Sequence, residues 1–204
     1  MTYDSPNSED YLPVTMEDFT AARRAMVLNQ LRPQGVTNLG VLSAMGTVAR
    51  EAYMPEGMRA AAYADRSLIM EGGAPMMPPA ELGILLNALD PKAGEKALVI
   101  GQGGAYSTAI LEALGLTVVR SEADAPSGRE AFDIILVEGS VAKLPDWVAS
   151  HLAAGGRVGA AILDNGVARL SVGRGDRGAV GFKSLADAQV PPLPAFQARP
   201  QFTF

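Results

Sequence analysis

The sequence predicts an α/β fold in which a mainly parallel sheet is covered by helices. Apolar runs at 97–100, 117–119 and 133–137 alternate with segments of helical periodicity, a pattern typical of parallel strands. A glycine-rich turn follows the first run directly. Two later runs, 158–163 and 167–172, are separated only by Asp164-Asn165-Gly166, a strong hairpin signal. We therefore expect an antiparallel extension at the C-terminal edge of the sheet.

The first third of the chain is expected to be helical. Thr15 can cap a helix that ends at Pro33, Asn38 can begin a second, a short third helix falls around 58–62, and Leu82, Leu85 and Leu89 share one face of a fourth. We divide the chain into a flexible tail, 1–14, and one domain, 15–204. Within that domain, 15–92 is the helical part and 93–204 is the sheet part.

Composition narrows the class of protein. The 204 residues are 48% hydrophobic, which suffices for one core, and they include no cysteine for disulfides or thiolate metal sites. The formal net charge of −5, with scattered arginines, argues against a nucleic-acid partner. No run approaches the length of a membrane helix, and nothing suggests a metal site. We expect a cytoplasmic protein without a membrane partner.

The glycine-rich turn carries the clearest indication of a ligand. It lies between a predicted strand and a helix, where bare backbone can approach a nucleotide. Glu122 follows the first glycine by 21 residues, close to the offset at which an acid accepts ribose hydroxyls. The candidate cofactor-binding residues are Gly101, Gln102, Gly103, Gly104, Tyr106 and Glu122. The alternative is a tight turn plus a solvated glutamate, which needs no ligand.

Several segments together resemble the protein-L-isoaspartate O-methyltransferase family: 26–33, Tyr63-Ala64-Asp65, the glycine turn, 132–137 and 152–158. The resemblance implies a Rossmann-like fold of the S-adenosylmethionine (SAM) methyltransferase class, with SAM as cofactor. It also implies methyl transfer to isoaspartyl side chains, so that the substrate is a carboxylate of a protein or peptide.

The same resemblance exposes departures from the family pattern. In the substrate loop, 73–79, the family's serine position is Met77, and a thioether cannot donate a hydrogen bond to a carboxylate. The acid of the first strand is replaced by Val99, and the third glycine by Ala105. No catalytic residue is assigned, and the candidates near the substrate are Met76, Met77 and Glu138, the last expected just after a strand.

These departures leave two main hypotheses for the function. The chain is either a SAM-dependent methyltransferase of altered activity or specificity, or a non-catalytic protein that binds a protein or small molecule on the same fold. A nicotinamide-dependent oxidoreductase is a third, weakened because Tyr106 stands where its fingerprint has a third glycine.

Further expectations concern the second half of the chain. Only 10 residues separate Glu122 from Asp133, too few for a helix and strand, so the third strand should be missing. The edge left unpaired favours a homodimer.

A helix is expected through Trp147 and Leu152 with a glycine cap at Gly155, and an extended proline-rich tail after Phe182. His151 is expected to face solvent or stabilise that helix end. The methionines of 54–77 either fill the core or form an adaptable binding surface.

Overall fold

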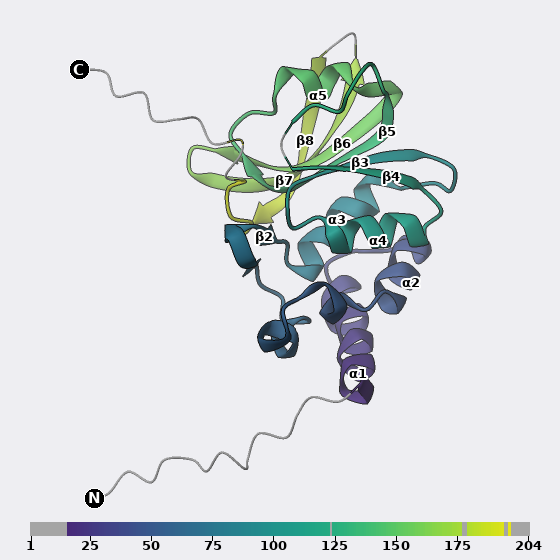
Figure 1. Ribbon diagram of the computed structural model, residues 1–204, viewed down its shortest axis with the longest axis vertical. Helices are drawn as coiled ribbons and strands as arrows, with labels where there is room; N and C mark the ends of the chain where they lie inside the picture. The colour runs from purple at the N-terminus through teal and green to yellow at the C-terminus, as the bar shows by residue number, and fades with distance from the viewer. Residues whose placement is uncertain (1–15, 123, 177–178, 194–195, 197–204) are drawn as a thin grey trace, which may run out of the picture.

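A six-stranded sheet with strand order β4-β3-β5-β6-β7-β8 forms the centre of the protein (Figure 1). The computed structural model describes residues 16–122, 124–176, 179–193 and 196; Thr15 and the tail 1–14 lie outside them. The strands are β3 (Lys96–Ile100), β4 (Thr117–Ser121), β5 (Phe132–Val141), β6 (Leu152–Asp164), β7 (Val167–Asp176) and β8 (Ala179–Ala188). The helices are α1 (Met16–Met26), α2 (Leu39–Thr47), α3 (Pro79–Leu89), α4 (Ala105–Ala113) and α5 (Asp146–Ser150).

Strands β4, β3, β5 and β6 are parallel, as the alternation of strands and helices predicts. In β3 all residues except Lys96 are buried, which explains the unbroken apolar run. Among the described residues no strand pairs with the outer edge of β4, and the chain passes from β4 to β5 without a helix. The expected loss of the third strand is therefore confirmed in the described part of the chain.

The antiparallel extension is larger than expected. Strands β6 and β7 pair from Asp164↔Val167 onward through a two-residue turn, in which Asn165 and Gly166 have φ of 49° and 82°. Strand β8 then pairs with β7 over its whole length. The expectation of an extended tail from Phe182 is wrong up to Ala188, because these residues form a sheet edge; the part of the tail beyond Phe196 lies outside the described residues.

The helix expected through Leu152 with a cap at Gly155 is also wrong. Helix α5 ends at Ser150, and Leu152 already pairs with Phe132 of β5, whose N–H donates to the His151 carbonyl at 2.8 Å. A Cβ on Gly156 would lie 2.9 Å from the Phe132 carbonyl oxygen. The glycine pair thus permits close approach of two strands at a register shift, rather than the end of a helix.

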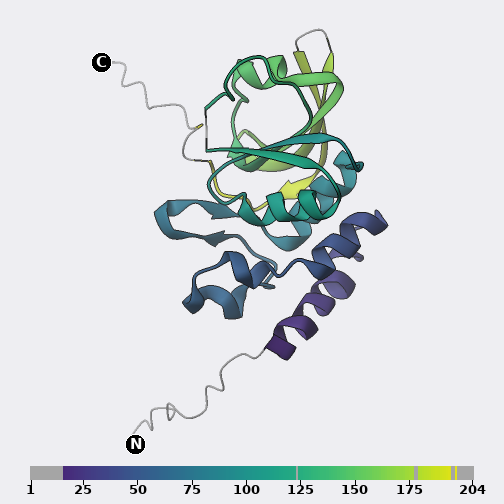
Figure 2. The ribbon, with the colours of Figure 1, turned by 45° about the vertical axis from the view of Figure 1, so that its right-hand side comes forward.

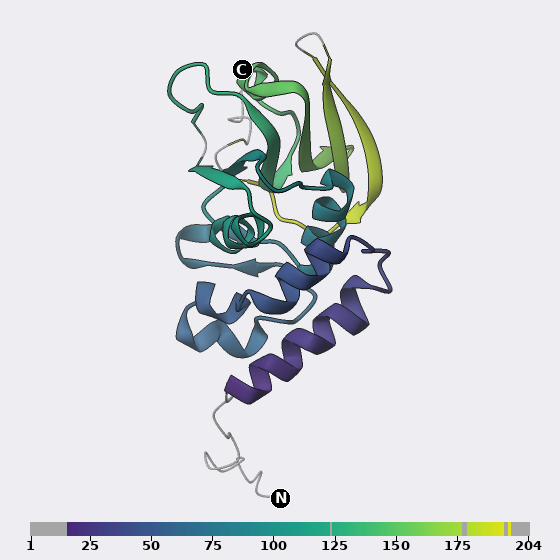
Figure 3. The same ribbon diagram turned by 90° about the vertical axis from the view of Figure 1, so that its right-hand side faces the viewer.

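The N-terminal helices stack against one face of the sheet, with α3 and α4 nearest to it and α1 farthest away (Figures 1 and 3). Asn38 caps α2, as expected, by accepting the Val41 N–H at 3.1 Å. The short segment expected as a third helix is a 3₁₀ turn, Glu56–Ala61. Another 3₁₀ turn, Arg50–Tyr53, lies between α2 and this segment, and the loop that contains β1 (Leu68–Ile69) and β2 (Pro75–Met76) follows it.

Two layers of apolar side chains hold the sheet. Ala97, Val99 and Leu136 face α3 and α4, whereas alternate residues such as Leu98 and Ile135 belong to a second cluster with Val148 of α5. Figure 2 shows how β7 and β8 curl, so that the far end of the sheet closes towards α5. Both faces of the parallel strands are therefore buried, as this type of sheet requires.

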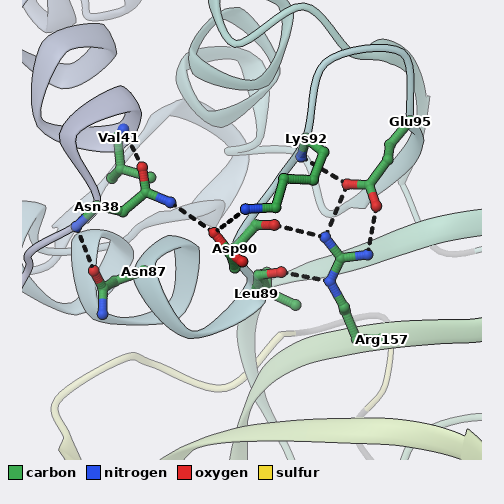
Figure 4. A network of polar contacts seen from close by, with 8 residues as sticks. All are labelled: Asn38, Val41, Asn87, Leu89, Asp90, Lys92, Glu95 and Arg157. Atoms are coloured by element: carbon green, nitrogen blue, oxygen red, sulfur yellow. Dashed lines mark hydrogen bonds and ion pairs between the residues drawn. The ribbon is translucent and has the colours of Figure 1, made fainter.

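A buried arginine joins the helical layer to the sheet (Figure 4). Arg157 of β6 donates to both carboxylate oxygens of Glu95 at 2.8 Å, and to the backbone carbonyls of Leu89 and Asp90 at the end of α3. On the other side of Asp90, its carboxylate accepts from Asn38 at the start of α2. The C-terminus of α3 is thus fixed both to the sheet and to α2.

Candidate functional site

The glycine turn lies at the carboxyl edge of the parallel strands, between β3 and α4. Gly101 has a φ of 123°, which L side chains rarely adopt, and its N–H donates to the Ser121 carbonyl of β4 at 2.8 Å. This bond ties the turn to the end of the neighbouring strand. The turn therefore sits where doubly wound sheets bind ligands.

The other two glycines of the turn are required by close packing. A Cβ on Gly104 would overlap the Val99 side chain, so the branched valine and the glycine fit one another. A Cβ on Gly103 would overlap the carbonyl oxygen of Pro75 in β2. The segment that follows β1 thus lies directly on the glycine turn. Ala105, at the family's third glycine position, begins α4.

Glu122 lies at the exposed end of β4, beside the glycine turn. The Gln102 amide donates to its carboxylate at 3.2 Å, and Arg120 donates to the Gln102 carbonyl at 3.4 Å. The predicted pairing of turn and acid is thus present in space. Because Glu122 is exposed, its carboxylate has free acceptor positions for hydroxyl groups.

Glu138 does not lie after a strand, as expected, but inside β5, where it is 1% exposed. Ser107 of α4 donates a hydrogen bond to its carboxyl group, and so does the Met77 N–H. Burial raises the pKa of Glu138, although the Ser107 bond and the nearby Arg50 oppose the shift. The glycine turn thus lies against a buried carboxyl group whose pKa is raised.

Met77, at the family's hydroxyl position, is 0% exposed. Its carbonyl accepts from Arg50 Nη2 at 2.6 Å, while its N–H reaches Glu138. One peptide segment is therefore held from the helical part and from the sheet at once. Met76 is also buried, and Met54, Met58 and Met70 are buried or pack against the same core. The methionines fill the core, one of the two alternatives from the sequence.

Arg50 is the feature that sequence reasoning missed. It is 0% exposed, its Nε donates to the Ala62 carbonyl at 2.8 Å, and its guanidinium lies 4.9 Å from the centre of the Tyr106 ring. Burial lowers its pKa, while neighbouring Tyr106 and Glu138 raise it. A single charged residue carries no sequence signal of burial, because its partners come from distant parts of the chain, and Ser107, beside Glu138, was missed for the same reason.

Tyr63 anchors the region next to this arginine. Its hydroxyl donates to Glu51 and accepts from Arg23 at 2.8 Å, and Arg23 pairs with Glu51 at 2.7 Å. Burial and the Glu51 bond raise the pKa of Tyr63 to about 12, so this hydroxyl stays protonated at neutral pH. Tyr63, from the Tyr63-Ala64-Asp65 motif, thus has a structural role: its hydroxyl helps to hold α1 against the 3₁₀ turn Arg50–Tyr53.

His151 does not face solvent. It is 8% exposed, follows α5 directly, and its Nδ1 lies 2.8 Å from the Trp147 carbonyl oxygen. This position is far from the glycine turn along the sheet and fits the alternative role at a helix end. Among the described residues, no group of three or more His, Asp or Glu side chains is arranged to hold a metal ion, and no helix has the length and apolarity to cross a bilayer.

A glycine turn after the first parallel strand, an acid at the end of the second, and helices on both faces define the Rossmann-like methyltransferase class. The comparisons agree on the family within that class. The sequence model of protein-L-isoaspartate(D-aspartate) O-methyltransferase matches residues 22–123. The chain belongs to this family, whose cofactor is S-adenosylmethionine.

Individual relatives support the assignment, and a solved structure shares the fold. A protein-L-isoaspartate O-methyltransferase of Methylorubrum populi is 32% identical over 165 residues, which cover 68% of this chain and 78% of the relative. One of Marinobacter nauticus is 38% identical over 106 residues, about half of each chain. A Plasmodium falciparum member solved with S-adenosyl-L-homocysteine has a TM-score of 0.69 at 17% identity, covering 85% of this chain and 98% of its own, which shows a common fold.

Proposed function

We propose that this chain binds S-adenosylmethionine at the glycine turn and methylates a carboxylate of a protein or peptide, with a specificity altered from that for isoaspartyl residues. The observation that carries the proposal is the glycine turn with Glu122 beside it, bridged by Gln102 at 3.2 Å. In a ligand-free role this exposed acid would need no fixed relation to the turn.

The residues present fit the cofactor at two points. The exposed carboxylate of Glu122 can accept the ribose hydroxyls. Near the other end of the turn, Tyr106 Oη and Arg50 Nη1 are buried and find no hydrogen-bond partner in the described part of the chain, so donors remain available there. When bound, the cofactor would supply the methyl group of its positively charged sulfur to a carboxylate oxygen of the substrate, which would leave a methyl ester and S-adenosylhomocysteine.

The altered specificity rests on Met77. A carboxylate moved into a buried site loses its hydration, and donors must replace the lost hydrogen bonds. Met77 offers none through its side chain, and its backbone N–H is engaged with Glu138. The loop therefore lacks the hydroxyl donor that the family resemblance implies for isoaspartyl groups.

A second candidate, a non-catalytic binding protein, is favoured by one observation. The Pro75 carbonyl lies on Gly103, so packing within the chain alone accounts for that glycine. On that view the turn keeps its glycines without any cofactor. The two candidates differ in one property that can be measured directly, which is affinity for the cofactor.

The first experiment is calorimetric titration of the full chain with SAM and S-adenosylhomocysteine. Micromolar binding is expected of the methyltransferase, together with methyl incorporation into a protein mixture that contains aspartyl and isoaspartyl residues. No binding at millimolar ligand would refute the methyltransferase and leave the binding protein.

The specificity is tested by Met77→Ser, which restores a hydroxyl at the family position. We expect methylation of an isoaspartyl peptide to be weak in the parent chain and to increase in the variant, although the smaller side chain costs about 2–4 kcal/mol of stability. Met45→Ser, at an equally buried site in α2, is the control for that loss. Isoaspartyl turnover that is already efficient in the parent would refute the altered specificity.

A further inference from the structure

Two buried donors without partners lie against each other beside the glycine turn. Arg50 and Tyr106 are 0% and 1% exposed, and the guanidinium carbon lies 4.9 Å from the centre of the tyrosine ring. Arg50 Nη1 and Tyr106 Oη have no hydrogen-bond partner among the described residues. Unpaired buried polar groups are uncommon, because each costs about 1–3 kcal/mol. Two such unpaired groups on side chains that touch each other therefore need a physical explanation.

The other hydrogen bonds of Arg50 indicate what kind of group its unpaired Nη1 could bind. Its Nε and Nη2 bond to the carbonyls of Ala62 and Met77, so the guanidinium is held rigidly with one nitrogen to spare. A planar guanidinium with free N–H groups is suited to a carboxylate, and a phenolic hydroxyl adds a further donor. Glu138, an acid whose charge raises the pKa of Arg50, accepts hydrogen bonds from Ser107 and from the Met77 N–H instead.

We propose that Arg50 and Tyr106 form the subsite for the carboxylate on the methionine end of S-adenosylmethionine and its product. The inference rests on the proposed function and names the residues that hold one end of the cofactor. Tyr106 stands in the first turn of α4, directly after the glycine turn, whereas Glu122 lies on the β4 side of the same turn. The carboxylate end of the ligand would then meet the donors of Arg50 and Tyr106, and its ribose hydroxyls would meet the acceptor oxygens of Glu122.

Access to this subsite requires the segment 74–77 to move. The Met77 carbonyl covers Arg50, and the Pro75 carbonyl covers Gly103. The segment is preceded by Gly72 and Gly73, with φ of 78° and 80°, and its strand β2 pairs with β1 through only two residues per strand. Such short pairs are weak. Opening would also release Arg50 Nη2 from Met77 and add its N–H groups to the subsite.

The test is Tyr106→Phe, read out by ligand affinity. Because the hydroxyl has no partner among the residues that the structure describes, its removal should leave the melting temperature unchanged or higher. We expect the affinity for S-adenosylhomocysteine to fall about tenfold, the worth of one hydrogen bond to a charged group. The affinity for 5′-methylthioadenosine, which lacks the amino-acid end, should stay the same.

Tyr53→Phe is the matched control, because the ring of Tyr53 lies 5.9 Å from that of Tyr106 and is 36% exposed. It should alter neither affinity. If the parent and Tyr106→Phe bind S-adenosylhomocysteine with equal affinity, the subsite is refuted and the proposed function still stands. The same holds if Tyr106→Phe loses affinity for S-adenosylhomocysteine and for 5′-methylthioadenosine by the same factor. If the parent binds neither ligand, the proposed function fails and the subsite fails with it.

Discussion

Glu138 is a carboxyl group enclosed by protein at the point where β5 passes the glycine turn. Its pKa is raised, chiefly by burial, and lowered in part by the bond from Ser107 and the charge of Arg50. Between the ordinary pKa of a glutamate and the raised value, the folded protein holds a proton that the unfolded chain has released. Within that range the stability of the fold decreases as the pH rises.

Glu138→Gln should therefore change how stability depends on pH. The glutamine keeps an oxygen that accepts from Ser107 but cannot ionise, so the variant lacks the decrease described above. We expect its free energy of unfolding, relative to the parent, to rise with pH from about 4.5 upward, by about 1.4 kcal/mol for each unit of pKa shift. Urea denaturation at a series of pH values measures this difference.

The control for that series is Glu112→Gln, which changes an exposed glutamate of the same neighbourhood on α4. Its unfolding free energy should differ little from that of the parent, because substitutions of exposed side chains change stability little. A constant difference between Glu138→Gln and the parent across the series would contradict a raised pKa in the folded state.

The hairpin of β6 and β7 is an element that its local sequence is enough to predict. Asn165 and Gly166 both adopt positive φ, and the strands on either side are fixed in register by this turn. We expect Gly166→Ala to lower the free energy of unfolding by about 1 kcal/mol, because the left-handed conformation is unfavourable for alanine. Gly57→Ala is a direct control: neither glycine has an atom within 4 Å of an added Cβ, but only Gly166 has positive φ. Equal effects in thermal unfolding would refute the argument.

The connection between α3 and the sheet depends on the geometry of one side chain. Arg157 binds Glu95 through two nitrogens and also reaches two carbonyls at the helix end, which a lysine cannot reproduce. Arg157→Lys should cost roughly 2–3 kcal/mol of unfolding free energy, since buried acceptors lose their donors.

Arg169→Lys provides the comparison, because Arg169 pairs with Asp164 and Asp187 at the surface, where ion pairs contribute little. Chemical denaturation should separate the two variants clearly. If both lysine variants were equally stable, the network of Figure 4 would contribute no more than a surface ion pair.

The elements differ in how far local sequence determines them. The cap at Asn38 and the turn at Asn165 follow from local conformation, and both were predicted correctly. The segment at Leu152 was misread because its apolar spacing fits a helix, whereas pairing with Phe132 decides for a strand. Strand β8 was missed because its described residues are mostly exposed and show no apolar alternation, and it forms by pairing with β7.

The same distinction applies to the site. The glycine turn and Glu122 are local signals at a characteristic spacing, and the structure places them together. Arg50 lies in a 3₁₀ turn and Glu138 in β5, 88 residues further along the chain (138 − 50 = 88), so only tertiary packing brings them together. Their burial could not be read from neighbouring residues, since charged side chains are buried only when distant groups provide partners.

At the scale of the whole molecule, stability is distributed unevenly around the site. The central strands β3 and β5 are buried on both faces, whereas β1 and β2 pair through two residues each and connect through two glycines of positive φ. Segments with few backbone hydrogen bonds open locally at a small fraction of the global unfolding free energy. The part of the chain that covers the glycine turn is thus better able to move than the central strands β3 and β5.

Hydrogen exchange tests this distribution directly. In the free protein we expect the amides of residues 68–76 to exchange at least about a hundredfold faster than those of β3 and β5, because local opening of the β1–β2 pair suffices. Saturating S-adenosylhomocysteine should slow exchange in 68–77 and in 101–106, while β7 and β8 serve as an internal reference far from the turn. Protection of 68–76 equal to that of β5 in the free protein would show that the segment does not open, and the cofactor could then not reach Arg50 and Tyr106.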